Sequence, residues 1–172
     1  MKNVHIYTTY LLALLALCSL SARTNAQDTK QDKQSTKEAA IKNMVDSQNY
    51  VFVAQTALPM SGRTRQLTSD YDLQVSKTSI ISYLPYFGRA YQAPLDPTKN
   101  SLDFTSKDFD YTATPGKKSG WTVTIKPKDN RDVQQMTLNI SSSGYGILQV
   151  TSTNRQPISF NGYIKAPRKK KA

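Results

Sequence analysis

Residues 121–140 read WTVTIKPKDNRDVQQMTLNI, and this stretch decides the fold class of the 172-residue chain. Polar and apolar residues alternate on both sides of the polar segment Lys128–Arg131. The apolar members are Trp121, Val123, Ile125, Met136, Leu138 and Ile140. Successive side chains of a strand point to opposite faces, so a period of two indicates one buried and one solvated face. The stretch therefore predicts two antiparallel strands joined by a turn.

The same period of two recurs along most of the chain, at about residues 67–75, 109–113 and 158–164. Segments rich in turn residues separate these runs, namely Ser76–Thr78, Pro115–Gly120, Ser142–Gly144 and Asn154–Pro157. Strands with one wet face are typical of antiparallel sheets. We therefore predict a mainly β fold, an antiparallel meander of about eight strands that forms either a sandwich or a small barrel. Alternation alone leaves that choice open.

One helix is expected before the strands. The sequence Ser35-Thr36-Lys37-Glu38 has the spacing of a capping box, with serine at the cap and glutamate three residues later. Ile41, Met44 and Val45 follow at helical spacing. These signals predict a helix over about 36–47 that faces the core with these three side chains and covers an open end or face of the sheet.

The N-terminal residues 1–26 have the layout of a secretory signal peptide. Lys2 supplies a positive charge, residues 10–20 form an apolar run, and Ala26 offers a small residue at the cleavage position. The run is too short to span a bilayer core of about 30 Å. Leu17 before Cys18 does not fit a lipoprotein signal. We expect cleavage near Ala26 and export to the periplasm or cell envelope.

Three segments are expected after that cleavage. Residues 27–34 contain no apolar residue and are predicted to be a flexible leader. Residues 35–166 are predicted to form a single β-rich domain. Residues 167–172 form a basic, disordered tail.

The net charge of +11 is concentrated at the ends of the chain, since only +5 is left without Lys2, Arg23 and the four cations of the tail. Those four cations, Arg168, Lys169, Lys170 and Lys171, are expected to make at most a weak contact with anionic lipid. The body has no basic run with interleaved aromatic residues, which argues against nucleic acid as a partner.

Several kinds of active site are excluded by composition. The single cysteine, Cys18, and the single histidine, His5, both lie in the signal peptide. The exported chain therefore has no thiolate or imidazole nucleophile and no ligand set for zinc. Phosphate-binding glycine motifs are absent from the sequence as well. We expect no cofactor and no metal, and the protein is predicted not to be an enzyme.

Carboxylates are the surviving candidates for acid–base chemistry. Asp70 with Asp72, and Asp108 with Asp110, each share one face of a strand. A glycosidase needs two carboxyl groups about 5–9.5 Å apart, but these pairs fall on the polar face, where solvent exposure is the simpler interpretation. Calcium binding by residues 129–132 is weakly supported, because three side-chain oxygens fall short of the six to eight that the ion takes.

Residues 83–91, YLPYFGRAY, break the strand pattern and combine four aromatic residues with an arginine. Pro85 and Gly88 predict a bend or bulge between strands. In the structural interpretation the aromatic side chains are buried at a sheet corner that Arg89 locks. In the functional one they bind a sugar ring, a lipid or a peptide. The candidate ligand-binding residues are Tyr83, Tyr86, Phe87, Arg89, Tyr91 and, from a later stretch, Arg155.

Three stretches together resemble a known family. They are Leu67–Leu73 (LTSDYDL), Ser82–Tyr91 (SYLPYFGRAY) and Val150–Phe160 (VTSTNRQPISF). They closely resemble the bacterial domain-of-unknown-function 4251 family, with similarity from about Met44 to Ile164. The resemblance implies an exported protein of Gram-negative bacteria with one all-β domain, and it brings no reaction, ligand or partner. It also suggests that Arg89 and Arg155 meet carboxylates such as Asp70 or Asp72.

The sequence favours an exported, non-enzymatic β-domain that binds a small ligand or an envelope protein. One alternative is a carboxylate-dependent hydrolase that acts on envelope glycans. Another is a structural module of the envelope. A hollow lined by aromatic side chains and convergent polar groups would support binding, and paired aspartates inside it would support the hydrolase.

Overall fold

The computed structural model describes residues 25–91, 102–116 and 119–168, with side chains from Gln34 onward. Residues 1–24 of the predicted signal peptide (residues 1–26) and the tail residues Lys169–Lys171 lie outside that part. One helix and ten strands are described. They are α2 (Asn25–Asp46), β1 (Tyr50–Pro59), β2 (Arg65–Gln66), β3 (Asp72–Val75), β4 (Ile80–Tyr83), β5 (Asp103–Ser106), β6 (Phe109–Pro115), β7 (Trp121–Pro127), β8 (Val133–Ile140), β9 (Tyr145–Ser152) and β10 (Ile158–Lys165).

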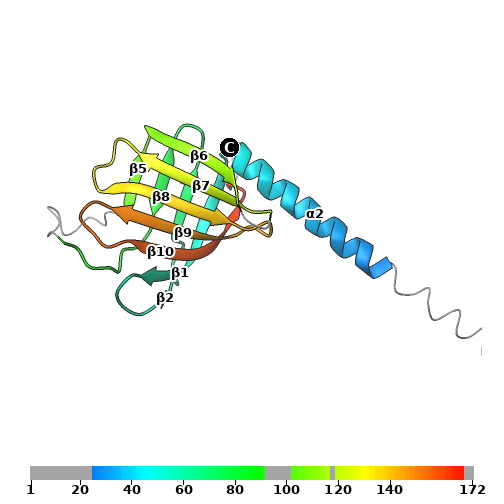
Figure 1. Ribbon diagram of the computed structural model, residues 1–172, viewed down its shortest axis with the longest axis horizontal. Helices are drawn as coiled ribbons and strands as arrows, with labels where there is room; N and C mark the ends of the chain where they lie inside the picture. Colours follow the sequence, from blue (N-terminus) through cyan, green and yellow to red (C-terminus); the bar gives the residue numbers. More distant parts are fainter. Residues whose placement is uncertain (1–24, 92–101, 117–118, 169–172) are drawn as a thin grey trace, which may run out of the picture. The chain divides into compact units, whose positions relative to one another are not determined.

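All strands belong to one antiparallel sheet in the order β5-β4-β3-β1-β10-β9-β8-β7-β6, with β2 added beside β1 (Figure 1). The mainly β prediction is therefore confirmed, although the strand number is higher than expected. Strands β5 and β6 lie at opposite edges of this order, yet only Lys107 and Asp108 connect them. Two residues span at most about 10 Å, so the sheet must curl until its edges approach each other. This connection gives a nearly closed barrel rather than a sandwich.

The gap between the two edge strands is bridged by a loop. Among the described residues no ladder joins β5 to β6. Instead, the Asp129 carboxylate, in the β7–β8 loop, accepts hydrogen bonds from the backbone N–H groups of Lys107 (2.8 Å) and Asp108 (3.3 Å). The Asp108 carbonyl accepts a third bond from the Lys128 N–H at 2.8 Å. The Ser106 hydroxyl and the two N–H groups lower the pKa of Asp129.

Inward-facing side chains fill the barrel and form one continuous core. The bulkiest fully buried members include Tyr50, Phe52, Leu73, Ile80, Ile125, Met136, Leu148 and Phe160, which come from strands around the whole sheet. Burying such a side chain contributes about 1.5–3 kcal/mol relative to leaving it exposed. In the described part of the chain these side chains occupy the interior of the barrel.

Helix α2 reaches the barrel through its last turns. Residues from Glu38 onward form one compact unit with the sheet. Within this unit Ile41 and Val45 are buried in the core and Met44 packs against it, as the helical spacing predicts. Gly144, in the β8–β9 turn, leaves room for Ile41, because a Cβ at Gly144 would lie 2.7 Å from the Ile41 Cδ1 atom. The helix ends where Gln48 adopts a positive φ of 51°.

The helix begins earlier than predicted. It starts at Asn25, so residues 27–34, which we expected to form a flexible leader, are helical. This segment has no glycine or proline and is rich in lysine and glutamine, which have a high helix propensity. It is continuous with the last turns of the same helix, so it needs no nucleus of its own. No apolar stretch long enough to cross a bilayer occurs in the described part of this helix.

Candidate functional site

The aromatic segment 83–91 leaves strand β4 at Tyr83 and turns, as Pro85 and Gly88 predict. Leu84 is fully buried and Pro85 is buried as well, whereas Tyr86 and Phe87 are half-buried. Gly88 permits the turn because a Cβ there would overlap the Tyr86 hydroxyl. The segment is therefore a corner anchored by its aliphatic residues, with its aromatic rings at the surface of the core.

The Tyr86 hydroxyl connects this corner to the loop between β9 and β10. Its oxygen lies 2.9 Å from the carbonyl oxygen of Arg89 and 3.0 Å from that of Gln156, so the O–H can donate to either acceptor. Burial raises the pKa of Tyr86, which keeps the proton on this donor. The phenol thus holds together two segments that are distant in the sequence.

A short backbone ladder strengthens the same connection. Ala90 and Arg155 form an isolated antiparallel bridge. The Tyr91 N–H donates to the Asn154 carbonyl at 2.8 Å, and the Gln156 N–H donates to the Arg89 carbonyl at 3.0 Å. Because these bonds use backbone atoms, they hold the corner in place whatever side chains it carries.

The arginines do not act as the sequence suggested. Arg155 lies over the Tyr86 ring, with its Cζ atom 5.1 Å from the ring centroid, and Arg65 lies over Phe87 at 4.8 Å. Arg89 contributes its carbonyl oxygen, and its guanidinium forms no ion pair within the described residues. The expected lock by Arg89, and the expected pairing of Arg89 and Arg155 with Asp70 or Asp72, are therefore wrong, because phenol and backbone acceptors take that role.

Two of the six candidate residues lie apart from this cluster. Tyr83 is 49% exposed on β4 and packs against Tyr71, with the ring centroids 5.4 Å apart. Tyr91 is 66% exposed and is held through its backbone. The structure thus groups Tyr86, Arg155 and the Arg89 carbonyl. Ligand binding by the six candidates stays a prediction.

A hollow of about 690 Å³ lies elsewhere, on the outer face of strands β7, β8, β9, β10 and β1. Its described polar side chains are Gln55, Thr122, Asn139, Ser141, Tyr145 and Asn161, and Trp121, Ile140 and Ile147 add apolar surface. Two large side chains stand out in this lining. Tyr145 is 63% exposed and Ile147 is 51% exposed, although both lie on a central strand.

The strand register explains why these side chains converge. Thr122 on β7 is the direct partner of Asn139 on β8, and Asn139 is the partner of Ile147 on β9. Ile147 is in turn the partner of Asn161 on β10. Directly paired residues share one face, so these four form a continuous row across the outer face of the sheet. Gln55 extends the row from the β-bulge between Ala54 and Thr56.

Four glycines also line the hollow next to this row. Gly146 and Gly162 are directly paired on β9 and β10, and Gly116 and Gly120 flank the hollow from the β6–β7 hairpin. On the inner side the Phe52 ring lies against the pair, 3.6 Å from a Cβ built on Gly146. A Cβ at Gly162 would overlap the Val53 carbonyl oxygen. The close approach of β1 to β10 therefore requires glycine here.

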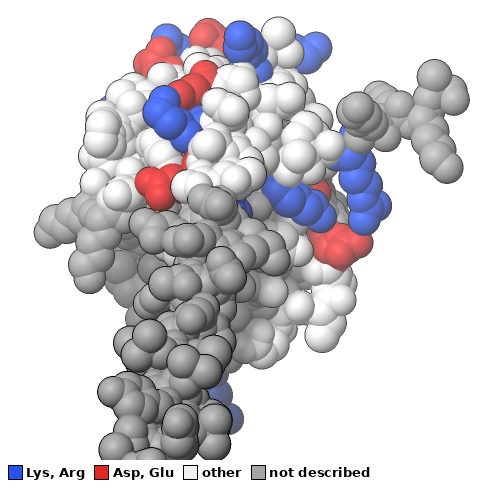
Figure 2. Space-filling model, turned by 90° about the vertical axis from the view of Figure 1, so that its right-hand side faces the viewer, with Lys and Arg blue, Asp and Glu red and all other residues white. Residues whose placement is uncertain are grey.

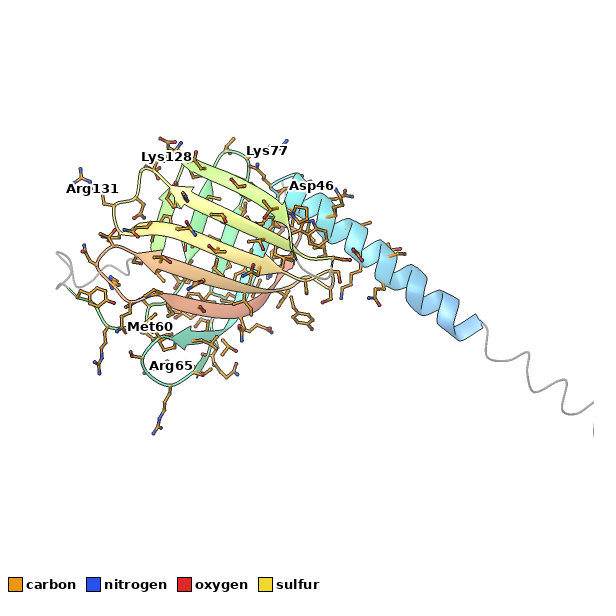
Figure 3. All side chains as sticks on the ribbon, in the orientation of Figure 1. Asp46, Met60, Arg65, Lys77, Lys128 and Arg131 are labelled. Atoms are coloured by element: carbon orange, nitrogen blue, oxygen red, sulfur yellow. The ribbon has the colours of Figure 1, made fainter. Side chains whose placement is uncertain are left out.

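The described lining of this hollow contains no Lys, Arg, Asp or Glu, and Lys117 and Lys118, between Gly116 and Gly120, lie outside the described residues. Cations and anions are interspersed on the described part of the face in Figure 2. Arg131 projects from the β7–β8 loop and Arg65 from β2 (Figure 3). The described lining of the hollow is therefore uncharged.

Three of the four paired carboxylates are exposed, as the simpler interpretation expects, and Asp72 is half-buried. Asp70, Asp108 and Asp110 are exposed, and Asp110 forms an ion pair with Lys128 at 2.6 Å. Asp70 and Asp72 line a smaller hollow of about 220 Å³ together with the cations Lys165 and Arg168. None of these carboxylates lines the larger hollow in the part of the chain that the structure describes.

The candidate calcium oxygens are used inside the fold. Asp129 binds the Lys107–Asp108 turn. The Asn130 side-chain oxygen accepts hydrogen bonds from the N–H groups of Asp132 (2.8 Å) and Val133 (3.0 Å). These oxygens therefore shape the β7–β8 loop.

The sequence pattern did not identify the uncharged hollow, although one signal pointed to it. In strand β9 the buried residues are Leu148 and Val150, whereas Tyr145 and Ile147 occupy the opposite, solvated face. Large apolar side chains on the wet face of an antiparallel strand are a departure that often marks a binding surface. Trp121, expected in the core, packs against it and also lines the hollow.

Comparison with known proteins gives a family and a fold. A family model described as "Domain of unknown function (DUF4251)" matches residues 32–164. The chain is similar to the crystal structure of a DUF4251 family protein from Bacteroides eggerthii, with a TM-score of 0.55 and 12% sequence identity. That alignment covers 76% of this chain and 88% of the other chain. At this identity the likeness concerns the fold alone. No curated protein matches the chain.

Proposed function

The chain belongs to the DUF4251 family of domains of unknown function, and from its surface we propose that it is an exported, non-enzymatic binding module. The hollow on strands β1 and β7–β10 is its binding site. The observation that carries this proposal is the exposed pair Tyr145 and Ile147 beside the amides of Asn139 and Asn161. Apolar surface with a few convergent polar groups is the usual composition of a ligand site.

Binding is favoured over hydrolysis by what surrounds the hollow. A hydrolase of this composition would need two carboxylates facing one cleft, because the chain after residue 26 contains no histidine or cysteine. Asp70 and Asp72 share the smaller hollow with two cations, and no carboxylate is in the described lining of the larger one. The described lining offers amides, hydroxyls and aromatic rings instead. Such groups hold a ligand by hydrogen bonding and stacking.

Export is proposed from the N-terminal sequence. The short positive region, the apolar run at residues 10–20 and the small residue Ala26 support it. We expect the full chain, expressed in a Gram-negative host, to be recovered from the periplasmic fraction with Gln27 as its first residue by intact-mass analysis. Recovery of the uncleaved chain from the cytosol would contradict export.

A thermal-shift screen tests the binding role. The full chain is mixed in turn with neutral and anionic glycans, lipid vesicles, peptides and divalent cations. Ile147→Lys places a cation in the hollow, and Gln149→Lys places one on the same face of β9 outside it. We expect a ligand that raises the melting temperature of the native chain and of Gln149→Lys but not that of Ile147→Lys. Equal shifts in both variants would exclude this hollow.

A further inference from the structure

The charge of the hollow restricts the class of its ligand. Ionic ligands are usually bound by Arg, Lys or carboxylate side chains, and the described lining has none of these. The apolar part of the described lining comes mainly from Trp121, Tyr145, Ile140 and Ile147, and the two aromatic rings among them can stack on the face of a sugar ring. The lining therefore matches an uncharged ligand that is rich in hydroxyl groups.

The amides in the lining suit hydroxyl groups in particular, because an amide both donates and accepts hydrogen bonds, as a hydroxyl does. The Thr122 hydroxyl donates to the Asn139 side-chain oxygen at 2.9 Å, which fixes that amide and leaves its two N–H donors available. Within the described residues the amides of Asn161 and Gln55 have no protein partner, and both side chains are exposed. Three amides are thus open to one ligand.

The spacing of the row suits a chain of sugar rings. Neighbouring strands are about 4.8 Å apart, so the row from Thr122 to Asn161 spans about 14 Å across β7 to β10. A pyranose ring in an extended polysaccharide occupies a length comparable to one strand spacing. The Tyr145 ring, two residues before Ile147 on the same face, offers a flat surface on which a sugar ring can stack.

Peptide binding by strand addition is disfavoured at this place. An added strand needs an unpaired sheet edge, but β7 lies between β6 and β8, and β1 lies between β3 and β10. The backbone groups beneath the hollow are already used in ladders. We therefore propose that the ligand is an uncharged, linear oligosaccharide lying across strands β7 to β10, an inference that rests on the binding function proposed above.

Trp121 provides the test, because it is the single tryptophan of the chain and it lines the hollow. Its emission is recorded while the full chain is titrated with maltohexaose, xylohexaose, mannohexaose and chitohexaose, with their disaccharides, and with polygalacturonate as an anionic glycan. We expect a saturable change with at least one neutral hexaose, weaker binding of its disaccharide, and no change with polygalacturonate.

Variants assign the binding to the row. Asn139→Ala and Asn161→Ala each remove one amide, and Gln149→Ala removes an exposed amide from β9 outside the hollow. We expect the first two to weaken hexaose binding about tenfold and the control to leave it unchanged. Far-UV circular dichroism shows that each variant is folded. Equal affinity of all three variants would overturn the assignment to this row.

The remaining outcomes separate this inference from the proposed function. In one outcome no neutral hexaose binds, but a peptide, a vesicle or an anionic glycan changes the Trp121 emission. The assignment of the ligand as an oligosaccharide is then wrong, and the proposed binding site is still supported. If no probe of any class changes the emission or the melting temperature, both the oligosaccharide and the binding function are contradicted.

Discussion

The Tyr86 hydroxyl oxygen lies 3.0 Å from the carbonyl oxygen of Gln156, although the two residues are 70 positions apart in the sequence. This contact, with the bridge between Ala90 and Arg155, attaches the aromatic corner to the β9–β10 loop. It shows that the most distinctive segment of the sequence is held by a phenol and by backbone atoms.

Tyr86→Phe tests that attachment. Removing the hydroxyl leaves two carbonyl groups without this donor, so we expect the free energy of unfolding to fall by about 1 kcal/mol. Urea denaturation followed by circular dichroism measures the change. Arg89→Ala is the matched control, because it keeps the carbonyl and removes only the guanidinium. Its stability should match that of the native chain, and a larger loss than in Tyr86→Phe would restore the arginine lock.

Gly162→Ala tests the close approach of β1 and β10. The added methyl group would overlap the Val53 carbonyl oxygen and press on the Phe52 ring. We expect a loss of about 3 kcal/mol or more, because backbone cannot move as a flexible side chain does. Gly116→Ala, whose Cβ would lie 3.3 Å from its nearest neighbour, should cost much less. Similar urea midpoints for the two variants would show that the barrel relaxes at Gly162.

Asp129→Asn tests the loop that bridges the edge strands. Because the pKa of Asp129 is lowered in the folded protein, its stabilising effect is present above the unfolded value of about 3.9 and is lost as the pH falls through the folded pKa. The native chain should therefore be more stable than Asp129→Asn at pH 7, and the difference should shrink on acidification. Melting temperatures between pH 7 and pH 2 measure it.

Asp103→Asn is the control for this series, since Asp103 is an exposed carboxylate of β5. At pH 7 its melting temperature should match that of the native chain. A constant difference between Asp129→Asn and the native chain over the whole range would mean that charge does not contribute to the bridge.

Tyr50→Phe tests the opposite end of the pH range. Burial, followed by the nearby Tyr111, raises the pKa of Tyr50 well above its ordinary value. Its effect on stability is constant below about pH 10, and above that pH the unfolded chain ionises first, so the folded state loses stability. We expect Tyr50→Phe to lose less stability than the native chain between pH 9 and pH 11. Tyr145→Phe, which removes an exposed hydroxyl, should match the native chain in stability at pH 7.

Much of the fold could be predicted because several strands alternate cleanly between polar and apolar residues. Strands β6, β7, β8 and β10 carry one wet face, and their turns contain the expected residues. Strand β1 was not predicted, because both faces of its first residues are buried, as Val51 and Phe52 show, and its sequence does not alternate. Closure into a barrel depends on the short connection between β5 and β6. Nothing in the local sequence pattern indicates that these two strands lie at opposite edges of the sheet.

The candidate site was harder to predict for a physical reason. Asn139, Ile147 and Asn161 are adjacent only because three separate ladders bring them into one row. Each is unremarkable in its own strand, whereas the aromatic segment 83–91 is conspicuous because its residues are consecutive. Sequence reasoning therefore identified the segment that is dense in unusual residues and missed the surface that the register assembles.

The most direct measurement of the central claim is an NMR titration of the side-chain amide signals of the full chain with a neutral hexaose. The account predicts that the signals of Gln55, Asn139 and Asn161 shift with a common saturation curve while that of Gln149 does not. Shifts confined to the aromatic corner and the β9–β10 loop, such as those of Tyr86 and Gln156, would contradict the account and place the ligand at the corner.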